Sequence, residues 1–251
     1  MVPDPFPKIA LDNDYGANLQ RKQMVWENPE FELKAFDSKV LDNGTIGVTV
    51  TYNVPRVKGT LTLTYNIANT GTIEVKESFD ATEGEEIANM FRFGMRVAIP
   101  DSFCNVEYMG RGPIENYSDR NSNTFVGRYS SSVDEQFYGY IRPQEAGNKT
   151  DLRWFTLSDA GRVSLTIIAP ELFSASALPY PQEAIHDGAR KQQSHPEFLE
   201  KDGNTYLCID KAQQGLACVN SWGAVPLPQY TLPYGDYEFT FVIVPNLDIY
   251  R

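Results

Sequence analysis

Apolar side chains recur at every second position in several stretches of this chain, and this period restricts its fold more than any other feature. Residues 45–54 read TIGVTVTYNV, in which the apolar positions are Ile46, Val48, Val50, Tyr52 and Val54. The same alternation recurs in residues 60–67 (TLTLTYNI) and 237–243 (YEFTFVI). Because successive side chains of a β-strand point to opposite faces, each stretch is predicted to be a half-buried strand.

Turn sequences separate these stretches. Asp42-Asn43-Gly44, Asn69-Thr70-Gly71 and residues 158–161 (SDAG) are typical of hairpin connections. The only helical candidate is residues 182–193, and Gly188 disfavours even that one. Many short strands with almost no helix predict an all-β fold of two large antiparallel sheets packed face to face. Further strands are expected at residues 31–40, 72–79, 91–98, 103–108, 152–157, 162–169, 172–178, 205–210 and 215–219.

The length of 251 residues is sufficient for one large core. We therefore expect a single domain over residues 1–251, with residues 1–30 as an extended lead-in segment. A hydrophobic content of 41% with 22% charged residues is ordinary for a globular chain. The three cysteines, Cys104, Cys208 and Cys218, have no CxxC spacing and are predicted to be buried free thiols.

Charge and hydropathy exclude two classes of partner. The formal net charge of -11, with no run of basic residues, disfavours nucleic acid, whose phosphates would be repelled. The longest apolar runs, such as residues 239–245, are far shorter than the roughly 20 residues that span a bilayer, so no membrane partner is expected. Residues 1–10 also lack the apolar core of a secretory signal.

The densest motif is residues 108–120, YMGRGPIENYSDR. Its glycines and proline predict a tight, irregular backbone. Glu115 and Asp119 could form the acid/base pair that glycoside cleavage requires. We favour the alternative, a structural network in which Arg111 and Arg120 pair with these carboxylates and hold a buried loop that also contains Asn116.

A second polar loop, residues 142–151 (RPQEAGNKTD), precedes the strand that contains Trp154. Its polar side chains are suited to satisfying loop backbone groups, and Glu145 is expected to pair with Lys149 or Arg153. A structural role is favoured here too.

Residues 220–224 (NSWGA) place a tryptophan between serine and glycine in a loop. An indole in such a place is suited to stacking on the apolar C–H face of a sugar, with neighbouring polar groups that recognise its hydroxyls. Trp222, Ser221 and Asn220 are therefore the candidate substrate-binding residues. The alternative is a tryptophan that fills the core.

Taken in order, residues 12–16 with Val25-Trp26, residues 108–120, residues 142–154 and residues 216–224 resemble the final domain of family 2 β-galactosidases, the domain-5 or small-chain region. The resemblance covers nearly the whole chain. It implies a supersandwich fold like that of the galactose mutarotases. It also implies a larger enzyme that hydrolyses terminal β-galactosides with retention, using two glutamates on a (β/α)8 barrel, neither of which can be placed on this sequence.

The resemblance implies that this domain completes the active-site mouth with Trp222 while the barrel performs the chemistry. No cofactor is then expected in this domain, and any Mg²⁺ or Na⁺ of such an enzyme belongs to the barrel. Val219 and Asn220 stand where acidic residues are commoner in the family, which affects the polar contacts beside the indole.

The expected partners are the barrel and other domains of the same protein, and a β-galactoside or oligosaccharide. A docking surface of this kind should be apolar, which also permits homo-oligomers. Two other functions are open from sequence: a carbohydrate-binding module that uses Trp26, Trp154 or Trp222, and an aldose 1-epimerase-like enzyme that uses His186 or His195.

Overall fold

The computed structural model describes residues 17–160, 163–186, 195–217, 220 and 223–247. Within them the chain forms eleven strands and two one-turn α-helices, α2 (Leu19–Lys22) and α3 (Gln182–Ile185), with short 3-10 turns between elements. The strands are β1 (Glu32–Val40), β2 (Ile46–Val54), β3 (Gly59–Ile67), β4 (Ile73–Ala81), β5 (Arg92–Pro100), β6 (Asn105–Gly112), β7 (Phe125–Ser132), β8 (Lys149–Ser158), β9 (Val163–Leu178), β10 (Asn204–Gln213) and β11 (Tyr237–Leu247).

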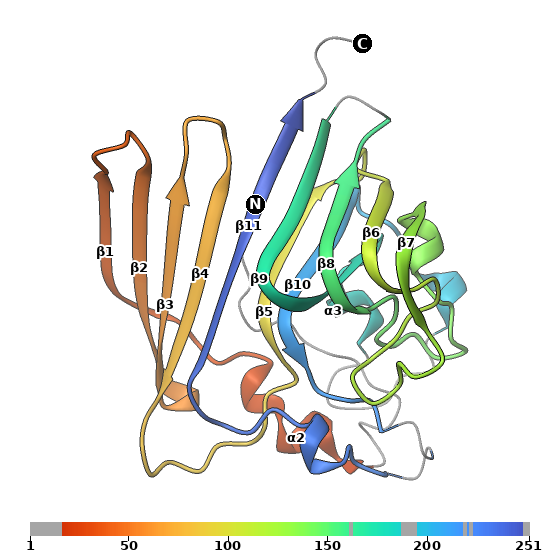
Figure 1. Ribbon diagram of the computed structural model, residues 1–251. Coiled ribbons are helices and arrows are strands. Elements are labelled where there is room, and N and C mark those ends of the chain that lie inside the picture. The colour runs from red at the N-terminus through yellow and green to blue at the C-terminus, as the bar shows by residue number, and fades with distance from the viewer. Residues whose placement is uncertain (1–16, 161–162, 187–194, 218–219, 221–222, 248–251) are drawn as a thin grey trace.

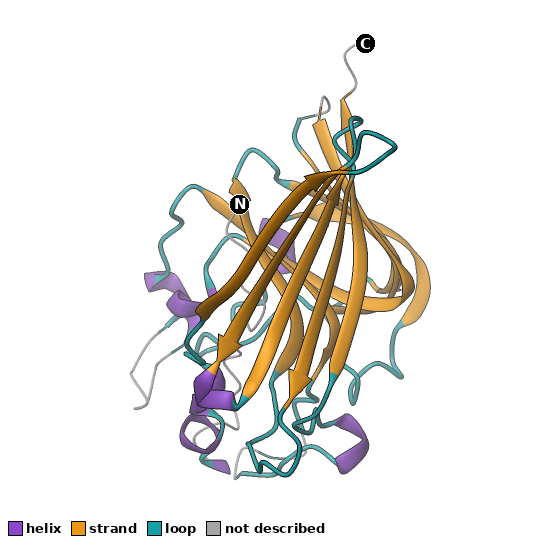
Figure 2. Ribbon diagram, turned by 90° about the vertical axis from the view of Figure 1, so that its left-hand side faces the viewer, coloured by secondary structure: helices purple, strands orange, loops and turns teal. Residues whose placement is uncertain are grey.

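The strands form a long antiparallel row in the order β1-β2-β3-β4-β11-β9-β8-β6-β7 (Figure 1). Strands β5 and β10 leave this row: they pair with each other, and β10 also pairs with β9. Figure 1 shows β5 and β10 behind the row, and Figure 2 shows the strong curvature of the sheet from the side. The expected all-β antiparallel sandwich is confirmed.

Strand β9 joins the two layers. Its residues 163–168 pair with β11 and β8, whereas residues 174–178 pair with β10. The two strands expected at 162–169 and 172–178 are thus one bent strand, and the hydrogen bonding is continuous between the layers. The bend contains Pro170, which has no N–H to donate to a ladder and lies between the last paired residue, Ile168, and the next, Phe173.

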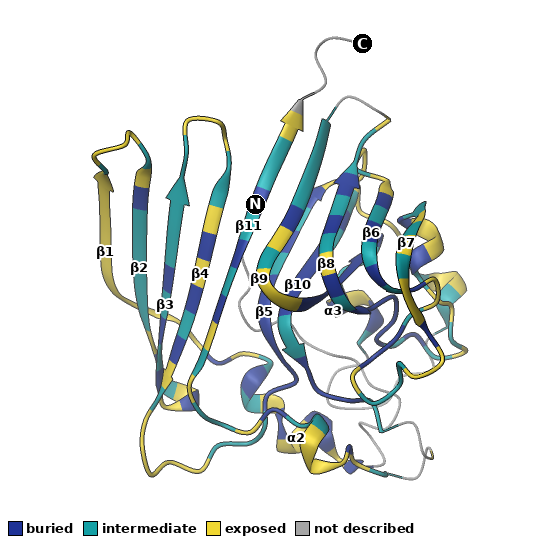
Figure 3. Ribbon diagram, viewed as in Figure 1, coloured by how far each residue is buried: buried dark blue, intermediate teal, exposed yellow. Residues whose placement is uncertain are grey.

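One apolar core fills the space between the layers. It includes Phe79 from β4, Phe93 from β5, Phe155 from β8 and Phe241 from β11, which are all fully buried. Figure 3 shows these strands buried near the second layer, whereas β1 is exposed along its whole length. The apolar residues at alternate positions of 45–54 are therefore buried only at one end of the strand: Val54 is buried, while Ile46 is exposed.

Several sequence expectations differ from the structure. Strand β7 was not predicted, because its sequence, FVGRYSSS, has no regular apolar alternation and none of its residues is fully buried. Residues 215–217 of the strand expected at 215–219 are not in a strand, and the helix expected at 182–193 is the single turn α3 in its described part. Residues 19–26 of the lead-in segment form helical turns instead of extended chain. Cys208 is buried as expected, Cys104 is exposed, and Cys218 lies outside the described residues.

Candidate functional site

Asn116 holds the two motif loops together. Its side-chain Oδ1 accepts hydrogen bonds from the backbone N and the Oγ1 of Thr150, at 2.9 and 2.6 Å, and its Nδ2 donates to the carbonyls of Arg111 and Ile114. The Asn148 side chain donates to the carbonyl of Asn116 at 2.9 Å. Since Asn116 is fully buried, these bonds satisfy groups that water cannot reach, and residues 108–120 and 142–151 form one unit.

Glu115 lies beside this unit and is bound by three donors. Its Oε1 accepts from the Arg120 guanidinium at 2.7 Å and from the Tyr140 hydroxyl, and its Oε2 accepts from the backbone N of Gly147 at 2.8 Å. Burial and the bond to this carboxylate raise the pKa of Tyr140 to about 12, so the phenol stays protonated and donates. Arg120 also lies over the ring of Tyr117, 5.0 Å from its centroid.

Asp119 binds a third segment of the chain. Its carboxylate accepts from the backbone N atoms of Leu216 and Ala217, at 3.1 and 2.7 Å. Gly215 allows this approach, because a Cβ there would lie 2.5 Å from Asp119 Oδ2. Asp119 therefore fixes the backbone a few residues before the candidate substrate-binding residues. Arg111, the remaining motif charge, was expected to pair with Glu115 or Asp119; it pairs instead with Asp151 of the second loop, at 2.5 Å, and donates to the carbonyl of Thr124.

Glu145 pairs with neither Lys149 nor Arg153, so that expectation is wrong. It belongs instead to a buried ion cluster with Arg92 of β5 and Asp210 of β10, which we call the Arg92 cluster. Arg92 lies 2.9 Å from Asp210 and 3.7 Å from Glu145, and all three side chains are almost fully buried. Desolvation raises the pKa of Glu145 and raises that of Asp210 to about 7, against the opposing charge of Arg92. Arg92 has no motif around it, so sequence reasoning missed it.

Trp222 and Ser221 lie outside the described residues, so the stacking role of the indole stays a prediction. Asn220 is exposed, and its Oδ1 accepts from the backbone N of Ala224 at 3.3 Å. This hydrogen bond lies within the loop of residues 220–224.

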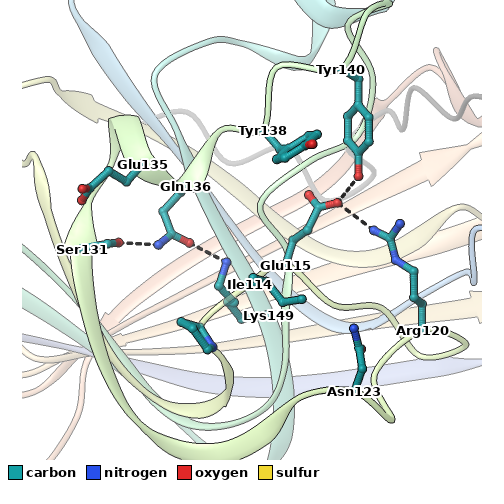
Figure 4. Close-up of a pocket in the computed structure, with 11 residues that line it drawn as sticks. Ile114, Glu115, Arg120, Asn123, Ser131, Glu135, Gln136, Tyr138, Tyr140 and Lys149 are labelled. Carbon is teal, nitrogen blue, oxygen red and sulfur yellow. Dashed lines mark hydrogen bonds and ion pairs between the residues drawn. The ribbon is translucent and has the colours of Figure 1, made fainter.

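A pocket of about 470 Å³ opens between the first motif loop and the segment that follows β7 (Figure 4). We call it the Glu115 pocket; its lining residues are Pro113, Ile114, Glu115, Arg120, Asn123, Ser131, Glu135, Gln136, Tyr138, Tyr140 and Lys149. Of these, Glu115 and Arg120 are candidate residues of the first motif, and Lys149 is the residue of the second loop that was expected to pair with Glu145. A smaller hollow of about 220 Å³ lies between Asp151 and Lys211.

The described part of the chain contains neither a candidate metal site nor a candidate membrane-spanning helix. No group of three or more His, Cys, Asp or Glu side chains there could hold a metal ion. None of the helices there is long and apolar enough to cross a membrane.

Comparison with known proteins identifies relatives along the whole chain. The family model of the β-galactosidase small chain matches residues 4–243. The β-galactosidase of Streptococcus thermophilus is 31% identical over 244 residues, which cover 96% of this chain and 23% of that protein. The β-galactosidase of Lactobacillus delbrueckii subsp. bulgaricus is 31% identical over 231 residues, covering 90% of this chain and 22% of that protein. The chain thus spans about a quarter of the length of these relatives.

Solved structures resemble the chain only distantly. The family 36 α-galactosidase AgaA of Geobacillus stearothermophilus has a TM-score of 0.48 at 10% identity, with 87% of this chain and 28% of that chain covered. An aldose epimerase homologue from C. elegans has a TM-score of 0.41 at 11% identity, with 85% and 69% covered.

Proposed function

The chain belongs to the β-galactosidase small-chain family, and we propose that it is the non-catalytic C-terminal sandwich, of the domain-5 type, of a retaining family 2 glycoside hydrolase. The observation that carries this proposal is the family match over residues 4–243, in a chain that spans only 23% of a β-galactosidase 31% identical to it. The catalytic glutamates of such an enzyme lie on a barrel that this chain does not contain.

The contacts of the motif carboxylates support a non-catalytic role. A retaining glycosidase needs two carboxyl groups about 5 Å apart, one that attacks the sugar and one that protonates the leaving oxygen. Glu115 is instead bound by Arg120, Tyr140 and the Gly147 backbone, and Asp119 by two backbone N–H groups. Both carboxylates hold the loops in place, which leaves neither poised as a nucleophile or as an acid.

We assign Trp222 the role of an aromatic wall at the mouth of the active site, with Ser221 and Asn220 beside it. Two facts support this assignment: the resemblance of residues 216–224 to the corresponding family motif, and the Asp119 bonds that fix the backbone at Leu216 and Ala217. A backbone fixed a few residues before Trp222 in the sequence would reduce the conformational entropy that sugar binding costs.

The first test is the activity of the purified chain on a chromogenic β-galactoside. We expect no hydrolysis above the buffer rate, because the chain lacks the barrel carboxylates. Turnover that copurifies with the chain through successive columns would refute the non-catalytic assignment.

The second test uses the whole β-galactosidase that contains this domain. Trp222→Ala should lower kcat/KM by up to about tenfold, since an aromatic contact contributes about 0.5–1.5 kcal/mol. Trp222→Phe, the matched control, keeps a ring and should retain most of the activity. Equal kinetics for the alanine variant and the wild type would contradict the assigned role of Trp222.

A further inference from the structure

The Glu115 pocket has two fixed polar walls. Figure 4 shows Tyr140, Glu115 and Arg120 joined on one side, and Ser131, Gln136 and Lys149 joined on the other. Both chains of bonds are part of the fold, so these groups keep their positions whether or not a ligand is present. Such prearranged polar groups are typical of small-molecule sites.

The Glu115 wall and the rim of the pocket keep some hydrogen-bonding capacity. A carboxylate has about four acceptor positions, and three donors bind that of Glu115. Lys149 is 1% exposed: its ammonium donates to Gln136 Oε1 at 2.7 Å and to the Gly147 carbonyl at 2.9 Å, and it lies 5.8 Å from the centroid of the Tyr108 ring, so Lys149 holds its wall in place. At the rim, the exposed amide of Asn123 has no hydrogen-bond partner in the described part of the chain. The pocket thus offers both an acceptor and donors.

Apolar surface completes the pocket. Tyr138 is 61% exposed, and its ring lies 4.6 Å from that of Tyr140, measured between centroids. Ile114, which is 55% exposed, also lines the pocket. An exposed aromatic ring next to fixed polar groups matches the two-faced chemistry of a sugar ring, which presents C–H groups on one face and hydroxyls at its edge.

Charge argues against other ligands. An anion would meet the carboxylates of Glu115 and Glu135, on a chain with net charge -11. A cation would meet Arg120 and the Lys149 ammonium. A purely apolar ligand would displace water from the Glu115 carboxylate and from the Asn123 amide without replacing its hydrogen bonds, at a cost in free energy. A neutral polyhydroxyl compound fits all three conditions, and about 470 Å³ is within the range of small-molecule pockets.

We propose that the Glu115 pocket binds one pyranose unit of a neutral sugar. Glu115 accepts from one hydroxyl, Asn123 donates to another, and the Tyr138 ring covers a C–H face. The inference rests on the pocket alone and does not require the role proposed for Trp222.

The test is a titration of the full chain, labelled with ¹⁵N, with D-galactose and methyl β-D-galactoside up to about 100 mM, since a single exposed site of this kind binds in the millimolar range. We expect saturable shifts of the Asn123 side-chain amide and of the Tyr138 and Gly139 backbone amides. Tyr138→Ala and Asn123→Ala should each weaken binding about fivefold or more, and Tyr138→Phe should not. Both alanine positions are exposed, so the fold should be retained.

Unsaturated or absent shifts at these amides would overturn the proposal, as would wild-type affinity in Tyr138→Ala. A Trp222→Ala chain separates the two proposals. If the shifts occur only near residues 220–224 and vanish in that variant, the pocket does not bind sugar while the role of Trp222 stands. If they persist at Asn123 in that variant, the pocket binds sugar independently.

Discussion

Asp119 is the side chain whose removal should release the backbone before Trp222. Its carboxylate accepts from Leu216 N at 3.1 Å and from Ala217 N at 2.7 Å, across 97 and 98 positions of sequence. Asp119→Ala removes both acceptors, and Asp119→Asn keeps one oxygen but places an amide donor against the other N–H. The alanine variant should therefore be the more damaging of the two.

The magnitude follows from the number and type of these bonds. A hydrogen bond to a charged group contributes about 1.5–3 kcal/mol, so two would contribute about 3–6 kcal/mol if fully buried. Asp119 is only half-buried, so in a variant water can partly replace its carboxylate as the acceptor. We therefore expect a loss of folding stability of about 2–4 kcal/mol for Asp119→Ala and about 1–2 kcal/mol for Asp119→Asn.

The assay is amide hydrogen exchange at Leu216 and Ala217 together with urea unfolding. A loss of 2 kcal/mol corresponds to exchange about 30-fold faster at these two amides. The control is Asp134→Ala, because Asp134 pairs with Lys201 at the surface, where an ion pair contributes about 0–1 kcal/mol. If Asp119→Ala leaves both amides as protected as in the wild type, the Asp119 carboxylate does not hold this segment.

Three further predictions concern stability, each measured by urea unfolding. Arg92→Met should cost about 3–5 kcal/mol by leaving buried carboxyls without a cation, whereas Arg128→Met, in an exposed pair, should cost less than about 1 kcal/mol; similar losses would contradict this. Burial raises the pKa of Glu77, so the wild type should lose stability as pH rises above about 4, by up to about 1.4 kcal/mol per unit. Glu77→Gln should lessen that loss, and what remains would come from Asp210 and Glu145, whose pKa values are also raised; parallel pH curves for the two chains would refute the contribution of Glu77. Gly94→Ala would place a Cβ 2.2 Å from a backbone oxygen of β10 and should lower the stability by about 3 kcal/mol. Its control, Gly47→Ala, meets its nearest side-chain atom at 3.6 Å and should lower the stability by about 1 kcal/mol or less; equal losses would contradict the role of the close contact at Gly94.

The alternation of residues predicted most strands because one side of each faces the core. Strands β2, β3, β4 and β11 lie where predicted, within a few residues at each end. Strand β7 shows the limit of this signal: none of its residues is fully buried, so its position depends on pairing with β6, which the residue pattern does not reveal. The bend within β9 was also out of reach, since the proline at residue 170 is compatible with a break between two strands.

The motif loops were recognisable as polar networks, but most of their partners were not. Sequence reasoning expected Glu145 to pair within its own loop, because nearby charges are the simplest partners. The structure pairs it with Arg92, 53 positions away, on strand β5, whose other residues are apolar except Arg96. Tyr140, which also holds Glu115, lies just before the second motif loop and has no recognisable motif of its own. Long-range polar pairs leave no periodic pattern, so only the fold reveals them.

These long-range pairs also determine what the loop end of the domain can do. A loop whose hydrogen bonds are all internal can move independently of the core. A loop that is bonded to a distant segment of the chain has to move together with that segment. Asn116 and Asp119 bind segments that begin 32 and 97 positions further along the chain. The backbone before Trp222 is therefore attached to the same unit that carries the Glu115 pocket. A perturbation of that unit, such as Asn116→Ala, should affect both places at once, whereas a substitution at the exposed Tyr138 should affect the pocket alone.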